Sequence, residues 1–371
     1  MDRRPALPKT AVALLQTGQA SSEHERKVHE QLANCISALL GLPFAGIWQA
    51  HLAEPHLYLI PDATLIGPQP HIRSEADLYG GVVSQPFMAG KAISHPLVDQ
   101  DAVAPAGWTD EFMRLAGDTV LPGYSAFDIA DALRAGELLL QNGPLRAKQV
   151  QGRAGRGQQI IRDQQQLRRW LKSLEDEELH TCGVVLEQNL RNVQTYSVGQ
   201  SRVGTQLISY FGQQRLTIAH DGASVYGGSD LHMVRGDYQL LQQQFASPLI
   251  KTAIEKAQRY EQAAEASFPG FIASRRNCDV ALGTAPSGQQ CIGVLEQSWR
   301  IGGASSAEIH ALLAFAADPV LERICASSWE FYGETPPIPD DGQVLYRGAD
   351  PEAGFITKGV TIKSWQPPAN P

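Results

Sequence analysis

Hydrophobic residues fall in short runs over the first hundred positions, and Pro, Gly and polar turns separate these runs. The runs predict strands at 11–15, 44–48, 57–60 and 81–83. Ser22 and Glu25 have the spacing of a capping box, which marks the start of a helix. The stretch after them places its apolar residues on one helical face, at Val28, Leu32, Ile36 and Leu39. Strands that alternate with a helix predict a small, partly parallel α/β sheet.

A second pattern begins near Asp110. A helix is expected at 111–115, then a turn-rich connector at 121–127. Asp128 is expected to cap a helix that carries Ile129, Leu133 and Leu138. Two short strands, 145–150 and 158–162, flank a glycine-rich loop and precede a polar helix at 164–174.

Strand signals dominate the next part of the chain, at 183–187, 194–199, 204–211, 215–219, 278–282 and 291–296. A helix at 248–266 precedes the last strand pair, and helices at 306–316 and 319–331 follow it. The glycine-rich segment 221–230 reads as a loop over a substrate or as a surface hairpin. The tail after Thr335 is rich in Pro and Gly, with one strand at 360–365.

Composition adds limits to this picture. The 371 residues carry a net charge of -8, which gives no electrostatic footprint for nucleic acid or an anionic membrane. No stretch approaches the roughly 18 apolar residues that span a bilayer. Five widely spaced cysteines are typical of reduced thiols. We therefore expect a cytoplasmic protein that acts on small molecules.

The glycine-rich loop is the first candidate for chemistry. It contains Gly152, Gly155 and Gly157, and Lys148 lies on the strand before it. Glycines let backbone amides turn toward a phosphate, and a nearby lysine adds positive charge. Between positions 146 and 169 seven basic residues accompany one acid, so this window has a net charge of +6. The loop is either a phosphate cradle between two strands or a tight structural hairpin.

Two carboxylates are the second candidate. Asp279 and Glu296 lie on consecutive predicted strands, and a hairpin centred between Ser287 and Gly288 places them opposite each other. Opposed like charges destabilise a sheet unless a cation lies between them, and magnesium prefers such oxygen ligands. The alternative is a different register in which both acids face solvent.

Strand alternation extends this candidate site. Glu296, Ser298 and Arg300 share one face of an extended chain. The segment 302–306 then opens a helix, whose backbone amides favour an anion or are simply capped by a serine.

The order of these features resembles the ATP-grasp superfamily, with ATP-binding domains of the biotin carboxylase and D-Ala-D-Ala ligase type. The features are a strand with Lys148, a glycine flap, a strand, a helix, a segment that ends at Glu187, then Asp279 and the run Glu-Gln-Ser-Trp-Arg at 296–300. The resemblance covers roughly residues 110–331. Segments 77–83 and 226–231 resemble an uncharacterised bacterial branch of the superfamily.

The resemblance implies an α+β / α/β chain: an ATP-grasp fold preceded by a small N-terminal α/β (pre-ATP-grasp) domain. The expected boundaries are 1–108 for that domain, 109–185 for a lid subdomain with the glycine flap, 186–333 for a subdomain with the metal site, and 334–371 for the tail.

The resemblance also implies the nucleotide site. Lys148 and the flap glycines Gly152, Gly155 and Gly157 would contact the phosphates of ATP. Lys91 would be the second lysine that contacts ATP, and Glu187 would line the adenine and ribose.

Asp279 and Glu296 match the magnesium-binding acids of the superfamily. Its terminal motif is usually Glu-x-Asn-x-Arg, so Ser298 replaces the asparagine as a metal ligand and Arg300 matches the arginine. Lys148 and Arg300 are the expected catalytic residues.

The implied activity is that of an ADP-forming carboxylate-amine ligase that uses ATP and Mg2+. It would convert a carboxylate into an acyl phosphate for attack by an amine or similar nucleophile. A small-molecule kinase and a non-catalytic nucleotide-binding protein remain the alternatives. The expected partners are small-molecule substrates and, in a homodimer, a second copy of the chain.

Overall fold

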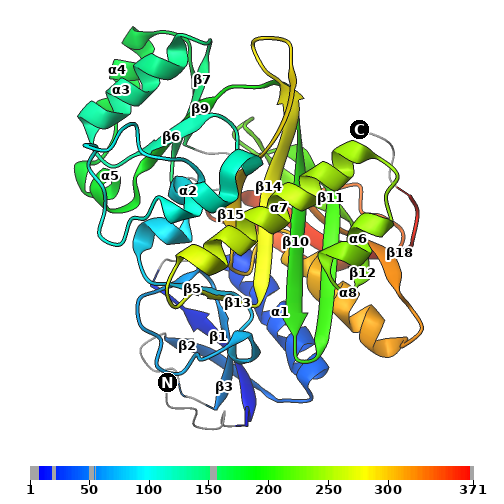
Figure 1. The fold of residues 1–371 in the computed structure, drawn as a ribbon. Coiled ribbons are helices and arrows are strands. Elements are labelled where there is room, and N and C mark those ends of the chain that lie inside the picture. Colours follow the sequence, from blue (N-terminus) through cyan, green and yellow to red (C-terminus); the bar gives the residue numbers. More distant parts are fainter. Residues whose placement is uncertain (1–7, 19–21, 50–53, 55, 151–156, 368–371) are drawn as a thin grey trace.

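The first strands form a parallel three-stranded sheet in the computed structural model, as the sequence predicts. β1 (Ala11–Gln16) lies between β2 (Phe44–Gln49) and β3 (Leu57–Pro61), and α1 (Glu23–Leu40) connects β1 to β2. The structure describes residues 8–18, 22–49, 54, 56–150 and 157–367. A crossover helix is the usual connection between parallel strands, because a tight turn can join only antiparallel strands. Figure 1 shows this part in blue.

Helix α1 begins and packs as its sequence pattern predicts. The backbone amide of Ser22 donates to the Glu25 carboxylate at 3.4 Å, which is half of the predicted capping box. Leu32 and Ile36 are buried, and Val28 and Leu39 pack at the edge of the same cluster.

A second sheet carries the segment around the glycine loop. It has the strand order β6 (Gly123–Ala126), β9 (Val184–Gln188), β7 (Leu145–Gln149) and β8 (Gln158–Ile161), and every pair is antiparallel. Helices α3 (Ile129–Leu140) and α4 (Gln164–Leu171) pack against it around Leu145, Leu167 and Leu186. Asp128 caps α3 by accepting hydrogen bonds from the amides of Ala130 and Asp131.

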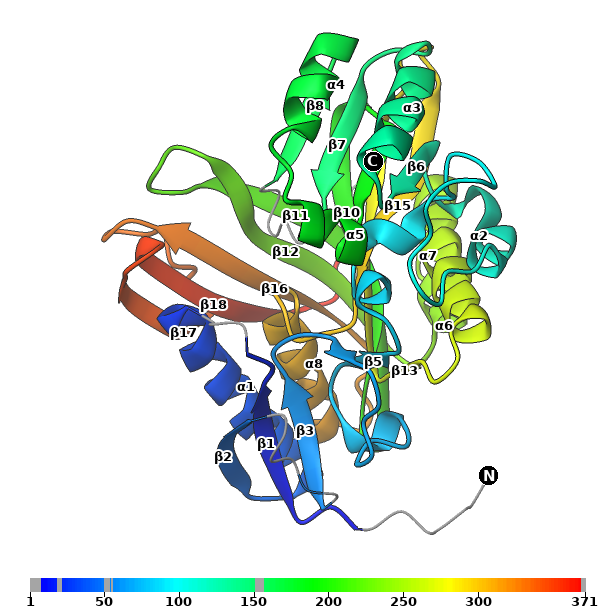
Figure 2. The same cartoon turned by 90° about the vertical axis from the view of Figure 1, so that its left-hand side faces the viewer.

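An antiparallel sheet of eight strands forms the largest layer of the molecule. Its order is β15 (Gln290–Ser298), β14 (Arg275–Thr284), β10 (Arg191–Val203), β11 (Gln206–Ile218), β12 (Ser224–Arg235), β16 (Arg323–Tyr332), β18 (Gly354–Ser364) and β17 (Gly342–Asp350). Figure 2 shows the four-stranded sheet above the region where β10, β11 and β15 run.

Helices cover both faces of this sheet. Phe211 packs into the cluster of α6 (Tyr238–Gln243) and α7 (Pro248–Ser267), whereas its neighbour Tyr210 packs into the cluster of α8 (Ser305–Ala317) and α1. Successive strand residues point to opposite faces, so this pair shows that the two helix groups lie on opposite sides. The remaining elements are short: α2 (Glu111–Ala116), α5 (Asp176–Cys182), the strands β4 (Leu65–Ile66), β5 (Gly81–Val83) and β13 (Ile272–Ala273), and 3-10 turns at Glu75–Asp77, Pro86–Ala89, Lys91–Ser94 and Gly117–Thr119.

Several sequence predictions were wrong in detail. The expected connector at 121–127 contains β6. The polar helix expected at 164–174 is α4, which ends at Leu171, and a further helix that was not predicted, α5, follows at Asp176–Cys182. The two strands expected at 204–211 and 215–219 are one strand, β11, with an irregular register at Arg215.

Three further segments join the eight-stranded sheet. Of the two alternatives for 221–230 the hairpin fits, because residues 224–230 lie in β12, which pairs with β11. The expected helix at 319–331 was wrong, because this segment is mostly β16. In β16 Ile324, Ala326 and Ser328 are buried at alternate positions, and the strand pairs with β12 and β18 on its two sides. Pairing on both sides outweighs local helix preference. The tail contributes β17 and β18 rather than one short strand, and the domain boundaries stay predictions.

Two expectations from composition have direct structural counterparts. None of the five cysteines, which all lie within the described residues, forms a disulfide. Among the described residues no helix is both long enough and apolar enough to cross a bilayer.

Candidate active site

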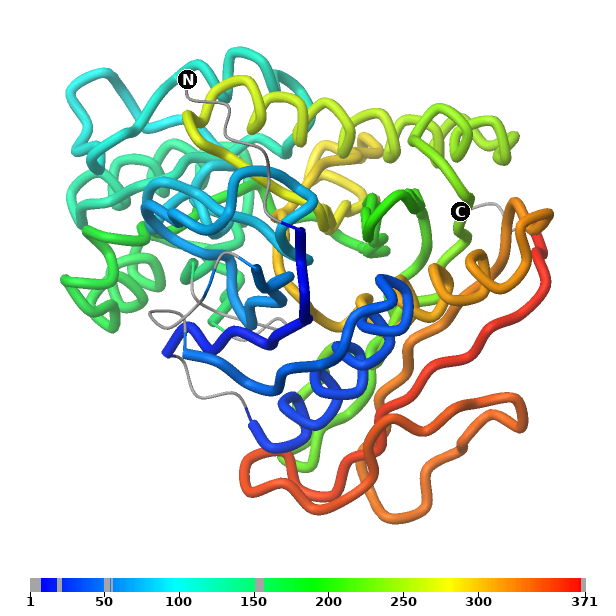
Figure 3. Tube along the Cα trace, turned by 90° about the horizontal axis from the view of Figure 1, so that it is seen from below, coloured from blue at the N-terminus to red at the C-terminus, as the bar shows by residue number. Residues whose placement is uncertain are grey.

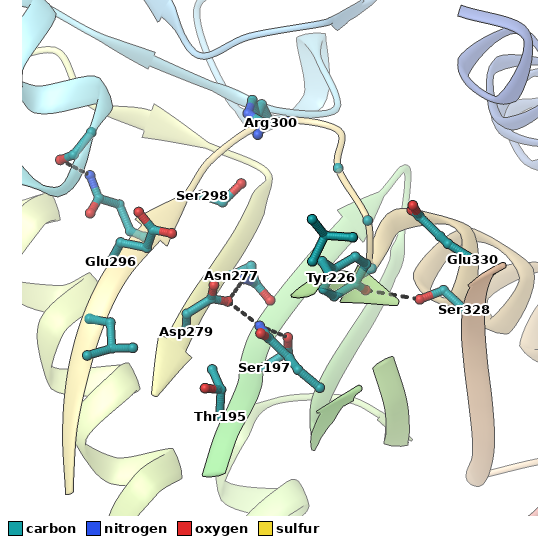
Figure 4. A pocket seen from close by; sticks show the side chains of 18 of the residues that line it. Thr195, Ser197, Tyr226, Asn277, Asp279, Glu296, Ser298, Arg300, Ser328 and Glu330 are labelled. Carbon is teal, nitrogen blue, oxygen red and sulfur yellow. Dashed lines mark hydrogen bonds between the residues drawn. The ribbon is translucent and has the colours of Figure 1, made fainter. Parts of the chain in front are cut away.

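A cleft of about 1180 Å³ lies between the four-stranded sheet and the eight-stranded sheet. Lys148 and Glu187 line it from the smaller sheet, and Asp279 and Glu296 line it from the larger one. Figure 4 shows the polar side chains on the larger sheet, which point into a common space. The structure thus brings together residues that the sequence places on separate segments.

Lys148 and Glu187 form a buried ion pair at one end of the cleft. The distance from Lys148 Nζ to Glu187 Oε1 is 2.6 Å, and the two side chains are 2% and 1% exposed. His95 Nε2 lies 3.3 Å from Glu187 Oε2. Burial alone would raise the pKa of Glu187, but Lys148 and His95 outweigh it and lower that pKa to about 2. Glu187 is therefore an ionised anchor that holds Lys148 at the cleft wall.

The glycine loop joins β7 to β8 beside this pair. Gly152 and Gly155 lie outside the described residues. Gly157 has φ +73°, and its carbonyl accepts a hydrogen bond from the Gln149 amide at 3.0 Å. A residue at this angle is most easily a glycine, so Gly157 ends the loop and starts β8.

Asp279 and Glu296 are directly opposite each other on β14 and β15, as predicted. Asp279 accepts hydrogen bonds from Gln214 Nε2 at 2.7 Å and from Asn277 Nδ2 at 3.1 Å. Burial and the nearby Glu296 nevertheless raise the pKa of Asp279 to about 7. The two acids repel each other, and a divalent cation between them would hold both in the ionised state.

A shift in register between Asp279 and Val280 creates this pairing. Nearer the turn Val280 faces Val294 and Thr284 faces Gln290, so the register there is one residue different from that at Asp279. A β-bulge of this kind inserts one extra residue, here Leu295, and reorients the side chains after it. The symmetrical hairpin assumed from the sequence predicts the correct pair without this bulge.

Lys91 is the neighbour of Glu296. Its Nζ lies 2.8 Å from Glu296 Oε2, and the lysine side chain is 2% exposed against 34% for the glutamate. The sequence predicts that Lys91 and Glu296 belong to the same site. It does not indicate that their side chains touch. In the structure a candidate phosphate-binding lysine touches a candidate metal ligand.

The run from 296 to 300 alternates as predicted. Glu296, Ser298 and Arg300 line the cleft. Trp299 does not line the cleft, and its Nε1 donates to Glu261 at 3.0 Å. Gln297 also belongs to the cleft lining, but its Nε2 donates to the Gly90 carbonyl at 2.7 Å. The buried side chains on the far face hold the three polar ones in place.

Arg275 supports the same run from behind. Its Nη1 donates to the carbonyl of Ser298 at 3.0 Å, to Ser298 Oγ at 3.1 Å and to the carbonyl of Arg300 at 2.8 Å. Its Nη2 lies 2.6 Å from Glu308 Oε1, and both side chains are almost fully buried. The Ser298 hydroxyl already accepts from a guanidinium, which makes it a poor metal ligand.

The site also contains residues that the sequence analysis missed. Gln214 reaches Asp279 from β11, and Ser197 receives a hydrogen bond from the same Gln214 amide at 3.0 Å. Tyr226 lies over the segment 302–303, with its hydroxyl 2.8 Å from Ser229 Oγ. Asn277 was also missed, although the sequence contains a signal for it. Asn277 and Asp279 are alternate residues of one strand, so both point to the cleft face.

Not every charged residue of the large sheet faces the cleft. Arg202 on β10 pairs with Glu75 at 3.2 Å and does not line the cleft. The described residues contain no group of three or more His, Cys, Asp or Glu side chains placed for a metal. The metal site therefore depends on the pair Asp279 and Glu296.

Comparison with solved structures identifies the fold. A biotin carboxylase from Campylobacter jejuni matches with a TM-score of 0.50 at 12% identity, over 95% of this chain and 87% of that one. A biotin carboxylase domain of 2-oxoglutarate carboxylase from Hydrogenobacter thermophilus matches with a TM-score of 0.52 at 14% identity, over 97% and 87%. An N5-carboxyaminoimidazole synthase from Aspergillus clavatus matches with a TM-score of 0.50 at 12% identity, over 96% and 94%.

Comparison with curated proteins finds no match. The similar solved structures are ATP-grasp enzymes, and they extend over nearly the whole chain. A family model described as "Protein of unknown function (DUF3182)" matches residues 12–360. The chain has the ATP-grasp fold and belongs to the DUF3182 family.

Proposed function

We propose that this protein is an ADP-forming ligase that uses ATP and Mg2+ to join a carboxylate to an amine or similar nucleophile. One observation carries the proposal: the opposed acids Asp279 and Glu296 share a cleft with two buried lysines and Arg300. The similar structures from Hydrogenobacter and Aspergillus were solved with ADP, the former also with magnesium and bicarbonate.

The nucleotide would lie along the smaller sheet. Lys148 and the flap amides, including that of Gly157, would neutralise the phosphates, and Lys91 would approach them from the side of Glu296. Glu187 would contact the adenine and ribose. It would also keep Lys148 extended into the cleft through their ion pair.

The acid pair suits magnesium because it presents carboxylate oxygens from two adjacent strands, and its members repel each other without a cation. Bound there, magnesium would supply charge neutralisation for the transferring phosphoryl group. Asp279 and Glu296 would hold it, and Gln214 and Asn277 would fix the orientation of Asp279.

The chemistry has two steps. A substrate carboxylate oxygen forms a bond to the γ-phosphorus of ATP while the bond from that phosphorus to the bridging oxygen breaks, which gives an acyl phosphate and ADP. The amine then attacks the acyl carbon, loses a proton and displaces phosphate. Arg300 lines the cleft beside Ser298 and would stabilise the negative charge that develops on the acyl phosphate.

The test compares Glu296→Gln with the matched control Glu255→Gln, because Glu255 is an exposed residue of α7 away from the cleft. ADP release is measured with ATP, Mg2+ and a panel of carboxylic acids and amines, and circular dichroism verifies the fold. We expect Glu296→Gln to lose at least 100-fold in turnover and the control to keep it. Equal turnover in the two variants would overturn the proposal.

The contact of Arg275 with Ser298 favours a second candidate, a non-catalytic nucleotide-binding protein, because it weakens one expected metal ligand. Calorimetry with Mg2+ and ADP separates the two candidates. Magnesium-dependent ADP binding without turnover across the panel supports the second candidate. A stable phosphorylated product that forms without an amine supports a kinase.

A further inference from the structure

A second part of the cleft lies between the first half of α1 and the strands β16 and β18. We call it the α1–β18 lobe and define it by six charged or titratable residues of the cleft lining, His24, Glu25, His29, Arg300, Glu330 and Lys358; the exposed Glu352 also belongs to this lining. The proposed nucleotide and metal contacts use none of these residues except Arg300. The lobe opens next to Arg300, so an occupant would reach the reacting end of the site.

The sheet side of the lobe carries an ion pair. Glu330 and Lys358 are directly opposite on β16 and β18, and Lys358 Nζ lies 3.1 Å from Glu330 Oε1. Each side chain is only 14% exposed. Ser328 and Glu330 alternate on β16, so both face the lobe, and Figure 4 shows them near Tyr226.

The helix side of the lobe carries an acid and two neutral imidazoles. Burial and the positive charge of Lys358 lower the pKa of His24 to about 4, and burial together with Arg300 and Lys358 lowers that of His29 to about 4. Burial would raise the pKa of Glu25, but Lys358 and the two histidines outweigh it and lower that pKa. Glu25, Lys358 and Arg300 all line this cleft, so the three charges face one space.

The lobe therefore presents both signs of charge. At neutral pH its partly buried residues provide two cations, Arg300 and Lys358, and two anions, Glu25 and Glu330, while both imidazoles are uncharged and the exposed Glu352 adds a third carboxylate. His24 is 8% exposed, and its Nδ1 has no hydrogen-bond partner among the described residues. A dianion would face two half-buried acids, and an uncharged apolar molecule would desolvate four charges without replacing their contacts with water.

We propose that the α1–β18 lobe binds the carboxylate substrate as a zwitterion of the amino-acid class. The substrate carboxylate faces Arg300, and its ammonium group faces Glu25 and Glu330. This inference rests on the proposed ligase function, because it takes the carboxylate at Arg300 to be the group that becomes phosphorylated. The inference adds that the substrate carries a positively charged ammonium group a few bonds from the reacting carboxylate.

Binding and turnover are measured with matched pairs of molecules that differ only in the amino group: alanine with propionate, glutamate with glutarate, and lysine with 6-aminohexanoate. Calorimetry on the full chain without nucleotide gives the affinities, and ADP release gives kcat/KM. We expect at least one α-amino acid to bind tenfold or more tightly than its partner without the α-amino group, a difference of about 1.4 kcal/mol.

Variants Glu25→Gln and Glu330→Gln should remove that preference, whereas Glu255→Gln on α7 should keep it. Thermal melts verify that each variant is folded. The inference is overturned if no amino acid binds, if both members of each pair bind equally, or if the two lobe variants keep the full preference. Amino-acid binding without any ADP release would contradict the ligase proposal and leave the lobe assignment standing.

Discussion

The ammonium group of Lys91 lies 2.8 Å from a carboxylate oxygen of Glu296, so a cation of the chain itself contacts one of the expected metal ligands. Lys91 thus neutralises the negative charge of Glu296, whereas no ion pair of the described residues does so for Asp279. Magnesium and Lys91 would then share Glu296 or compete for it. The pair is the most direct place to perturb the site.

Replacing Lys91 with Met removes this competing cation and also a candidate phosphate contact. We expect kcat/KM for ATP to fall by about 100-fold, the usual cost of losing one preorganised donor to a developing charge. The affinity of the nucleotide-free protein for Mn2+ should rise, because Glu296 loses its partner. Coupled ADP assays and electron paramagnetic resonance of Mn2+ measure the two effects. Lys251→Met, an exposed substitution on α7, is the control, and a fall in Mn2+ affinity would contradict the expectation.

The raised pKa of Asp279 makes stability depend on pH. Because the native pKa of about 7 lies above the ordinary value near 4, the native state binds this proton more tightly than the unfolded state. The resulting stability is fully present below about pH 4 and is lost as the pH rises through 7. Asp279→Asn should therefore raise the melting temperature at pH 8 in EDTA and change it little at pH 4. A larger gain at pH 4 would show that the sign is wrong.

Breaking the buried pair of Arg275 and Glu308 should destabilise the fold. Arg275→Met leaves Glu308 charged in the core, and we expect the free energy of unfolding to fall by about 3–5 kcal/mol. Arg275→Lys keeps the charge and should lose less stability, but one ammonium group cannot replace the guanidinium contacts to Ser298 and Arg300. Urea unfolding and ADP release measure the two properties separately. Full activity in a folded Arg275→Lys variant would contradict this positioning role.

Gly302 and Gly303 offer a matched pair of substitutions. A Cβ atom at Gly303 would lie 2.5 Å from the Tyr226 ring, whereas one at Gly302 would have its nearest contact at 3.5 Å, with Arg300. Gly303→Ala should cost about 1–3 kcal/mol of stability, the usual cost of overpacking, and should displace Tyr226 from the cleft. Gly302→Ala should be nearly neutral. Thermal melts and tyrosine-sensitive near-ultraviolet dichroism measure the effects, and equal changes in both variants would contradict the explanation.

Local patterns explain why part of the site could be predicted. The polar alternation of Glu296, Ser298 and Arg300 and the hairpin spacing of Asp279 require only neighbouring residues and strand geometry. The position of Lys148 before the glycine loop and the order of the motifs can likewise be read directly from the sequence. The register near the turn differs by one residue from the predicted one, and the bulge at Leu295 compensates for this difference, so the predicted pair still forms.

Contacts between distant segments explain what was missed. No pattern within residues 87–95 indicates that Lys91 meets Glu296, or that His95 meets Glu187. The segment 319–331 has apolar residues compatible with a helix, and only its pairing with β12 and β18 makes it a strand. The role of Gln214 in holding Asp279 depends on the order of strands in the sheet, which short-range periodicity does not contain.

The contact between α1 and the hairpin of β17 and β18 links the two ends of the folded chain. Gln31 donates to the Leu345 carbonyl at 2.7 Å, and the His24 amide donates to Asp350 at 3.3 Å; Figure 3 shows α1 beside these strands. Lys358 on β18 lines the same cleft as Glu25 on α1. During synthesis on the ribosome the cleft therefore stays incomplete until β18 has emerged. The part of the cleft between α1 and β18 can form only after the residues of β18 have been translated.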